Sequence, residues 1–372
     1  MPGRALGIAG GVSNRRNWMG AKHVRIKISA VMLAMVIPLA VAGCGREKQD
    51  VSAPPVPTSR PPGAVSPTAG SFAPNAISRE ALDGVARASK PYKLVLIVKT
   101  KNNPFFIPMI NAFEETAKEL GARAEVQAAP QEDSYEQQAA LVQAEASKGA
   151  QAILITPASS TSLVAPLKRA QDKGILIVNL DNRLNAATVK AQGLTLGGYV
   201  GADNEAGGRL AGEAMVAALN GTGDVAVIEG IRSADNAAAR KRGFESAVAG
   251  KLKVVDEQTG EWDTEKAHAR AQAILAKHPT LAGIFCANDS MAIGAIQAVS
   301  EAGKTSKVRV VGYDDIPGVQ DDLKSGALTA TIEQHPDLMG KYGARLAVAI
   351  LDGKANKGGE FLVPLETIKG KK

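Results

Sequence analysis

Cysteine, histidine and aromatic side chains are all scarce in this chain. Two cysteines among 372 residues cannot form a disulfide framework or a cysteine-rich metal site. The four histidines do not pair at the spacings that metal sites use. We therefore expect neither a metal nor a cofactor. Aromatic residues make up only 4% of the chain, so any aromatic cluster near a candidate site is informative.

Motifs of the common enzyme classes are also missing. The chain contains no Gly-x-Ser-x-Gly elbow, no phosphate-binding P-loop and no Cys-x-x-Cys. The glycines of NGTGDV (220–225) lack the spacing of a dinucleotide loop and are typical of a turn. Cys286 lies in an apolar stretch, where a cysteine is usually inert core. An enzyme is therefore not expected.

The basic charge is concentrated at the amino end. The formal net charge is +7, but residues 1–43 hold six basic side chains and no acidic one. The remainder holds 38 basic against 37 acidic side chains, which removes the main support for a phosphate-binding surface. Residues 1–90 also offer no helix-turn-helix. We therefore expect no nucleic-acid partner, which argues against a DNA-binding repressor.

Residues 1–43 have the pattern of a secretory signal peptide. Their uncharged apolar run (29–43) follows a basic segment and is shorter than the roughly 20 residues that span a bilayer. The run ends in Val-Ala-Gly-Cys44, which resembles the lipobox of bacterial lipoproteins, where the cysteine thiol receives a diacylglycerol. We expect lipidation of Cys44; a transmembrane anchor is the alternative. Met1 and Met19 are both candidate starts.

Residues 44–91 have the composition of a flexible tether. They are rich in Pro, Ala, Ser and Gly, and such a segment buries too little apolar surface to fold. A lipid at Cys44 followed by this spacer would hold a folded domain near a membrane. The predicted location is therefore the periplasmic or extracellular face of the cell membrane, with the leaflet left open.

From Lys93 onward, apolar runs alternate with amphipathic stretches. Continuous apolar runs favour parallel strands covered on both faces, and they occur at 94–100, 152–156, 175–180, 224–230, 281–289 and 308–314. Helical stretches such as 104–121, 134–149 and 291–304 separate them. This alternation predicts an α/β fold with doubly wound parallel sheets. A folded part of about 280 residues is larger than a single hydrophobic core usually supports, so we expect two lobes.

Polar side chains follow four of these predicted strands, where open parallel sheets bind ligands. They are amides and carboxylates, at 102–103, 181–182, 288–289 and 314–315, and Phe105, Phe106 and Tyr313 are their neighbours in the sequence. Amide and carboxylate acceptors combined with flat apolar faces suit neutral, hydroxyl-rich ligands. Asn103 and Asp289 could instead simply cap helices.

With these residues the sequence resembles the ribose-binding protein family of periplasmic sugar-binding proteins, the solute receptors of ABC transporters. The resemblance covers roughly residues 92–370. Its six motifs occur in order: NNPFF at 102–106, NLDNR at 179–183, AARKRGF at 238–244, FCANDSMAIGA at 285–295, VVGYDDIPG at 310–318 and TIEQHPDLMG at 331–340. The resemblance implies the type I periplasmic-binding-protein fold, in which two lobes close around one sugar.

The resemblance also implies a set of ligand-binding residues. They are Asn103, Phe105, Phe106, Asp181, Asn182, Arg240, Trp262, Asn288, Asp314 and Gln334. Arg240 offers a planar fork for two neighbouring hydroxyl groups, and the two aspartates accept charge-assisted hydrogen bonds. We expect Phe106 and Trp262 to sandwich the sugar ring.

Two positions depart from the ribose pattern. Trp262 stands where ribose binders tend to have phenylalanine. Ribose binders place an arginine directly after the first-lobe aspartate, whereas this chain has Asn182 there and Arg183 one residue later. Successive residues of an extended chain point to opposite sides, so Arg183 is no simple replacement. Another pentose, a hexose or a polyol therefore remains as plausible as ribose.

The resemblance implies an N-terminal lobe of residues 92–201 plus 336–357 and a C-terminal lobe of 205–332 plus 361–370. A hinge of three segments should join them, near Ala202, near Gln334 and within 352–361. The expected function is the lipid-anchored, monomeric binding protein of an ABC sugar importer, delivering a monosaccharide or polyol to the permease. A sugar sensor that presents its closed form to a chemoreceptor or a kinase is the alternative, and a surface sugar enzyme is less favoured.

Overall fold

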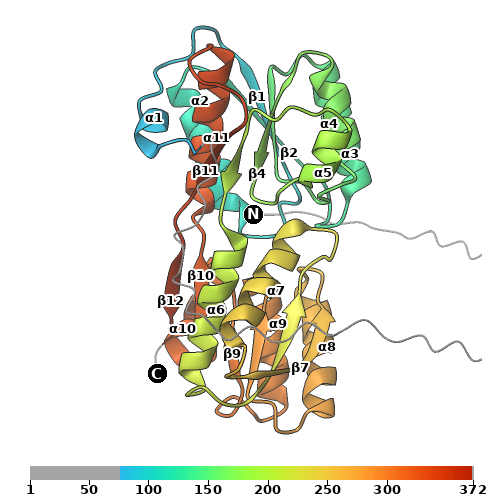
Figure 1. Cartoon of the computed structure of the whole chain (residues 1–372), viewed down its shortest axis with the longest axis vertical. Helices are drawn as coiled ribbons and strands as arrows, with labels where there is room; N and C mark the ends of the chain where they lie inside the picture. Colours follow the sequence, from blue (N-terminus) through green and yellow to red (C-terminus); the bar gives the residue numbers. More distant parts are fainter. Residues whose placement is uncertain (1–75, 371–372) are drawn as a thin grey trace, which may run out of the picture. The chain divides into compact units, whose positions relative to one another are not determined.

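The computed structural model describes residues 76–370. The predicted signal peptide (1–43), Cys44 and most of the predicted tether lie outside the described residues. Within them the chain forms two six-stranded sheets, each covered by helices on both faces (Figure 1). We call each sheet with its helices a lobe. The two α/β lobes predicted from the sequence are confirmed.

The first lobe is built on a parallel sheet with strand order β11-β5-β4-β3-β1-β2. Its strands are β1 (Lys93–Val98), β2 (Arg123–Ala128), β3 (Ala152–Ile155), β4 (Leu176–Leu180), β5 (Gly198–Gly201) and β11 (Gly359–Leu362). Its helices are α1 (Arg79–Asp83), α2 (Phe106–Glu119), α3 (Tyr135–Ser147), α4 (Val164–Gln171), α5 (Ala186–Ala191) and α11 (Pro336–Leu351).

The second lobe has strand order β12-β10-β9-β8-β6-β7, with β12 antiparallel to β10 and the other pairs parallel. Its strands are β6 (Asp224–Glu229), β7 (Lys253–Thr259), β8 (Gly283–Cys286), β9 (Arg309–Val311), β10 (Ala330–Glu333) and β12 (Glu366–Lys369). Its helices are α6 (Asn204–Ala218), α7 (Asp235–Val248), α8 (Thr264–Lys277), α9 (Asp289–Glu301), a 3-10 turn η1 (Pro317–Val319) and α10 (Gln320–Ser325).

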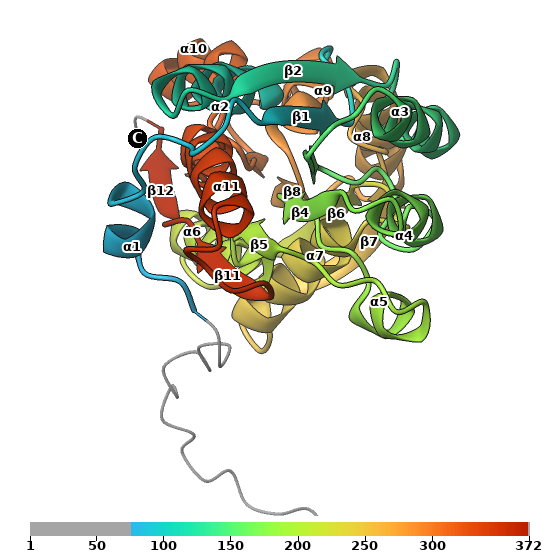
Figure 2. The same cartoon turned by 90° about the horizontal axis from the view of Figure 1, so that it is seen from above.

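The apolar runs are buried on both faces, as parallel strands require. In β1, Leu94 and Leu96 join the core formed with α2 and α11, while Val95 and Ile97 join a separate core formed with α3 and α4. Figure 2 shows these two pairs of helices on opposite sides of the sheet. This packing places the carboxyl ends of the strands, and the loops that follow them, at the boundary between the lobes.

Between Lys93 and Gly370 the chain crosses three times between the lobes: after β5, after β10 and after β11. The last crossing corrects the sequence prediction, which placed it within 352–361 and assigned 361–370 to the second lobe. Residues Gly359–Leu362 instead pair with β5 in the first lobe. Phe361 is buried there, with its ring centroid 4.5 Å from that of Tyr342 in α11. Only β12, after residues 363–365, belongs to the second sheet.

The predicted tether is shorter than the sequence suggested, because residues 76–91 fold onto the first lobe. Ile77 donates its backbone N–H to the carbonyl of Glu360 in β11. Ser78 caps α1, a five-residue helix that buries Leu82. The carboxylate of Asp352 accepts hydrogen bonds from Ser89 and from the Tyr92 hydroxyl. A composition average over 44–91 could not detect so short an ordered end.

Candidate functional site

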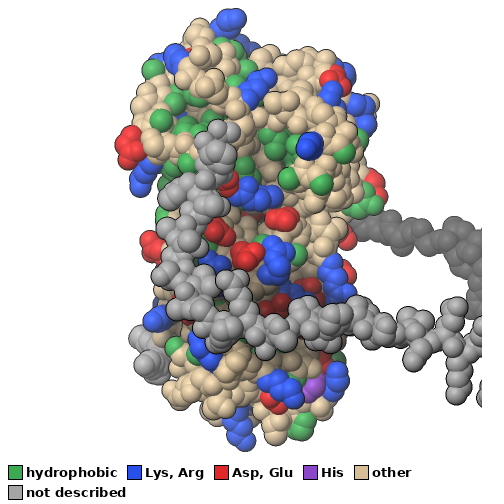
Figure 3. All heavy atoms as spheres, viewed as in Figure 1, with side chains coloured by type: hydrophobic (Ala, Val, Ile, Leu, Met, Phe, Trp, Pro, Cys, Tyr) green, Lys and Arg blue, Asp and Glu red, His purple; other side chains and the backbone are tan. Residues whose placement is uncertain are grey.

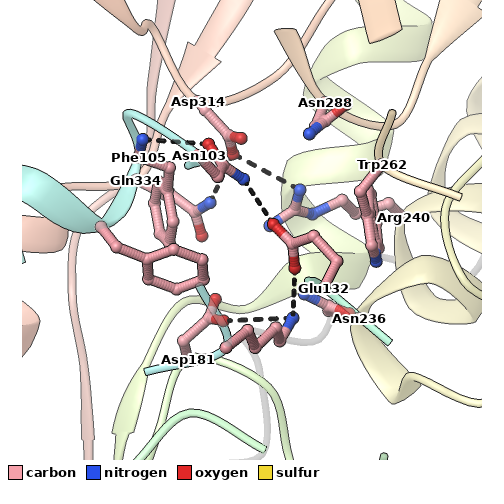
Figure 4. Close-up of a pocket in the computed structure, with 12 residues that line it drawn as sticks. Asn103, Phe105, Glu132, Asp181, Asn236, Arg240, Trp262, Asn288, Asp314 and Gln334 are labelled. Carbon is pink, nitrogen blue, oxygen red and sulfur yellow. Dashed lines mark hydrogen bonds and ion pairs between the residues drawn. The ribbon is translucent and has the colours of Figure 1, made fainter. Parts of the chain in front are cut away.

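A small cavity lies between the lobes, at the carboxyl ends of both sheets (Figure 4). The empty space within it, including space open to solvent, is about 240 Å³. Twelve side chains from both lobes and one crossing segment line it: Lys99, Asn103, Phe105, Phe106, Glu132, Asp181, Asn236, Arg240, Trp262, Asn288, Asp314 and Gln334.

Nine of the ten side chains expected from the sequence line this cavity, and Asn182 does not. Asn182 is fully buried beside the cavity. Its Nδ2 donates to the carbonyl of Pro157 in the first lobe at 2.8 Å, and its Oδ1 accepts from the backbone N–H of Asn236 in the second lobe at 3.1 Å. The cause is the backbone of Asp181, whose positive φ of 58° turns the chain directly after β4. The structure therefore does not place Asn182 among the lining residues, and ligand contacts of the other nine remain a prediction.

Three lining residues escaped the sequence reading: Lys99, Glu132 and Asn236. Lys99 directly follows β1, which ends at Val98. The predicted strand extended to residue 100, two residues too far, so Lys99 was counted as part of the strand. Glu132 follows β2, a half-exposed edge strand without a continuous apolar run. Asn236 lies in the first turn of α7, away from any predicted strand end, so no pattern in the sequence marked it as a candidate ligand-binding residue.

Two of these residues bring charge into the cavity. The Lys99 ammonium lies 3.7 Å from Oδ2 of Asp181 and 4.0 Å from Oε2 of Glu132. Asn103 donates from Nδ2 to Oε1 of Glu132 at 2.8 Å. Burial raises the pKa of the Glu132 carboxyl, and the neighbouring Lys99 partly opposes that shift. The first-lobe wall therefore combines one ammonium group with two acidic side chains.

Arg240 dominates the second-lobe wall. Its Nε donates to Oδ1 of Asn204 at 2.7 Å, and its Nη1 donates to the carbonyl of Ala287 at 2.8 Å and to Oδ1 of Asp314 at 3.4 Å. Its guanidinium carbon lies 3.7 Å from the ring centroid of Tyr313. These contacts fix the plane of a buried guanidinium group before any ligand arrives, as tight binding requires.

Asp314 is held by an unusual loop between β9 and η1. Asp314 and Asp315 both have positive φ, 117° and 54°. Asp289, in the first turn of α9, fixes both ends of this loop, because its carboxylate accepts from the backbone N–H groups of Tyr313 and Ile316. Burial raises the pKa of Asp289 to about 7 and that of Asp314 well above its ordinary value, although Arg240 opposes the shift of Asp314.

Trp262 and Phe106 provide flat apolar walls from opposite lobes. Glu261 and Trp262 both have positive φ, 54° and 65°, which turns the indole into the cavity directly before α8. The ring lies against Gly230, where an added Cβ would lie 2.0 Å from Cζ2 of Trp262. A side chain of only 6% exposure, packed this closely against backbone, is a rigid platform for a ring.

Four buried polar atoms of the lining residues have no hydrogen-bond partner among the described residues. They are Oδ1 of Asp181, Oδ1 of Asn236, Oε1 of Gln334 and Nε1 of Trp262. Buried polar atoms of this kind are rare and call for a functional explanation. Three of the four are acceptors, so the matching ligand is one that donates several hydrogen bonds, as a molecule with many hydroxyl groups does.

Residues 76–370 contain neither a membrane-spanning helix nor a metal-binding cluster. No helix of this part of the chain is both long enough and apolar enough to cross a membrane. Nor do the His, Cys, Asp and Glu residues of this part form a group of three or more that could hold a metal ion.

Comparison with known proteins agrees with this geometry. The model of the periplasmic binding protein domain family matches residues 94–355. The D-allose-binding periplasmic protein of Escherichia coli is 37% identical over 76% of this chain and 89% of its own length. The D-ribose/D-allose-binding protein of Pseudomonas aeruginosa is 35% identical over 74% of this chain and 88% of its own length.

A solved structure shows the same similarity. It is a periplasmic solute-binding protein of an ABC transporter from Actinobacillus succinogenes with bound D-allose, 36% identical, with a TM-score of 0.70 over 75% of this chain and 97% of that one. The family and the fold expected from the sequence motifs are confirmed. These relatives are named as binding proteins, which agrees with the expectation that the chain is not an enzyme. The chain therefore belongs to the periplasmic binding protein family, whose members work outside the cytoplasm.

Proposed function

We propose that this chain is the substrate-binding lipoprotein of an ABC sugar importer and that it holds one monosaccharide or polyol in the cavity between its lobes. The observation that carries the proposal is the set of buried, unpartnered acceptors on Asp181, Asn236 and Gln334, enclosed between Phe106 and Trp262. Hydroxyl groups would satisfy the acceptors, and the apolar faces of a sugar ring would pack on the aromatic walls.

The relatives make D-allose and D-ribose the first sugars to test. These two sugars share the configuration of carbons 2, 3 and 4. Each also has a common epimer at carbon 3: D-glucose for D-allose and D-xylose for D-ribose. A cavity with fixed polar groups should separate such epimers strongly, because the wrong epimer leaves a buried group unpaired. A panel of these four sugars and a polyol therefore tests both the class and the configuration.

We expect the emission of Trp262 to change when the right sugar binds to the processed, secreted chain. Trp262 is the only tryptophan expected in that chain, because Trp18 lies in the predicted signal peptide. Its exposure and neighbours should change as the lobes close. The measurement is a fluorescence titration, paired with calorimetry, in which binding is expected at micromolar concentrations, about −8 kcal/mol.

Calorimetry separates two ways in which this expectation could fail. A sugar that binds by heat without changing the emission would place Trp262 outside the binding cleft. If no sugar and no polyol binds by either method, the proposal of a sugar receptor is wrong. If binding holds, loss of uptake of the radiolabelled sugar after deletion of the gene would support an importer over a sensor.

The lipid anchor is the second part of the proposal, and it rests on the sequence alone. Cys44→Ser should yield an unlipidated precursor or a soluble, released form, because the acylated thiol is lost. Metabolic labelling with a radioactive fatty acid and membrane fractionation are the measurements. A mutant protein that stays as firmly bound to membranes as the wild type would contradict the anchor.

A further inference from the structure

Helix α7 begins without a cap of its own, unlike its neighbours in the second lobe. The first N–H groups of a helix lack partners within the helix and need acceptors from elsewhere. The side chains of Asp203, Asp263 and Asn288 provide them for α6, α8 and α9. At α7 the capping position is Ala234, whose side chain accepts nothing.

The acceptors for α7 come from the opposite lobe. The backbone N–H of Asp235 donates to Oγ of Ser160 at 2.9 Å, and that of Asn236 donates to Oδ1 of Asn182 at 3.1 Å. A third bond joins the same surfaces, from the N–H of Ser160 to the carbonyl of Ser233 at 3.2 Å. Ser160 and Asn182 follow β3 and β4 of the first lobe, so a helix of one lobe is capped by loops of the other.

The orientation of Asn182 is fixed by its own lobe. Its Nδ2 donates to the carbonyl of Pro157 at 2.8 Å and lies 3.3 Å from Oγ of Ser160. With the amide nitrogen held in this way, the amide oxygen must face α7. Asn182 is fully buried and Ser160 nearly so, which excludes water as an easy substitute while the lobes touch.

The contact lies close to a charged surface. Figure 3 shows acidic and basic side chains gathered in the band between the lobes. A groove on the molecule is lined by charged residues of both lobes, among them Arg183, Glu360, Asp235 and Arg242. Arg183 is paired with Glu360 and stacks on Tyr199, which explains why it does not reach the cavity. This leaves the position after Asp181 without a role in the cavity.

We propose that Asn182 and Ser160 form a closure latch, a pair of first-lobe acceptors that cap α7 only when the lobes are closed. The inference rests on the proposed function, because it assumes that closure accompanies binding. When the lobes separate, both N–H groups of α7 lose these partners. The latch therefore stabilises the closed form and raises the affinity for any ligand that needs closure, without touching it. It also positions α7, which brings Asn236 and Arg240 to the cavity.

The test compares Asn182→Ala and Ser160→Ala with Asn185→Ala. Asn185 caps α5 wholly within the first lobe, accepting from the N–H of Thr188 at 2.9 Å, so its loss removes a cap of the same chemistry that does not cross the lobes. For the full processed chain, both latch variants should weaken binding of each sugar in the panel by the same factor, roughly 2- to 30-fold, the effect of one lost cap. Asn185→Ala should lower Tm and leave Kd unchanged.

X-ray scattering from the sugar-free proteins tests closure directly. The latch variants should have a larger radius of gyration than the wild type, because each loses a hydrogen bond of the closed form, and sugar should reduce this radius less. A change in the ranking of D-allose, D-ribose and their epimers in Asn182→Ala but not in Ser160→Ala would show a direct ligand contact of Asn182 and overturn the latch. An unchanged Kd in both variants would overturn it as well.

Failure of the latch and failure of the proposed function give different results. If the wild type binds no sugar, the proposed function falls, and the scattering comparison alone decides the latch: a larger radius in both variants supports it, and equal radii overturn it. If Asn182→Ala does not fold because the bond to Pro157 is lost, Ser160→Ala still decides, since Ser160 contributes its own acceptor to α7.

Discussion

Arg240→Ala should weaken sugar binding by about 2–5 kcal/mol, a factor of roughly 30 to 5,000 in Kd. The variant loses the hydrogen bonds that the guanidinium donates to the ligand. It also loses the buried hydrogen bonds that hold the neighbouring groups of the second-lobe wall in place. Arg240 is 2% exposed and connects Asn204, the carbonyl of Ala287 and Asp314. Calorimetry with the best sugar of the panel gives the change.

A matched control lies two residues along the same helix. Arg242 pairs with Glu205 at 3.3 Å, and both side chains are about half exposed. Exposed pairs of this kind contribute about 0–1 kcal/mol to stability, so Arg242→Ala should bind sugar like the wild type. If Arg240→Ala also retains wild-type affinity, Arg240 has to be removed from the proposed site.

The sugar-free Arg240→Ala protein should still fold, and the reason is the carboxyl group that the arginine leaves behind. Arg240 lowers the pKa of Asp314, which burial already raises. Without the arginine, the pKa of Asp314 should rise further and the group should take up a proton, so that no uncompensated charge stays buried. A nearly unchanged far-ultraviolet circular dichroism spectrum with a modest decrease in Tm is therefore expected.

Most polar side chains at the ends of central strands were predictable from the sequence. Strands β1, β4, β8 and β9 read as continuous apolar runs, and polar side chains directly after them, such as Asp181 and Asp314, line the cavity. The edge strand β2 is only partly buried and has no such run, so Glu132 behind it went unnoticed. Burial on both faces therefore helped to locate strand ends. Lys99 after the central strand β1 was still missed, because the predicted strand extended to residue 100.

The direction in which a side chain points could not be predicted from the sequence. Asn182 neighbours a lining residue and belongs to a family motif, yet the positive φ of Asp181 turns its amide away from the cavity. Nothing in the residue types of this segment requires that torsion. In the fold, the Asp181 N–H donates to the carbonyl of Val200, and the Asp181 carbonyl accepts from the Tyr199 hydroxyl. The assignment of 361–370 to the second lobe was wrong for the first residues of that range, because a four-residue strand such as β11 can add to an edge of either sheet.

Helices α6 and α7 pack so closely that Gly208→Ala should destabilise the fold by about 3 kcal/mol or more, the upper end of the usual cost of overpacking. These two helices touch backbone to backbone. A Cβ on Gly208 would lie 2.0 Å from the carbonyl oxygen of Arg240, and one on Gly243 would lie 2.0 Å from that of Glu205. Because the obstructing atoms are backbone, no rotamer change relieves the overlap, and the helices must move apart.

This displacement should reach the site as well as the fold. The carbonyl in question belongs to Arg240, and the helix that would shift also presents Asn236 to the cavity and begins at the latch. We therefore expect Gly208→Ala to lower Tm by roughly 6–12 °C and to weaken sugar binding in the protein that remains folded. Differential scanning calorimetry and a sugar titration below the transition measure the two effects.

Gly318→Ala is the control, because it makes the same chemical change where there is room. A Cβ there would come no closer than 3.4 Å to a side-chain carbon of Ile293, which is ordinary contact. Its effect on stability should therefore stay within about 0.5 kcal/mol. Equal melting temperatures for the two variants would mean that α6 and α7 do not approach as closely as described. A low Tm for Gly208→Ala with unchanged sugar affinity would instead separate the stability of this helix pair from the placement of Arg240.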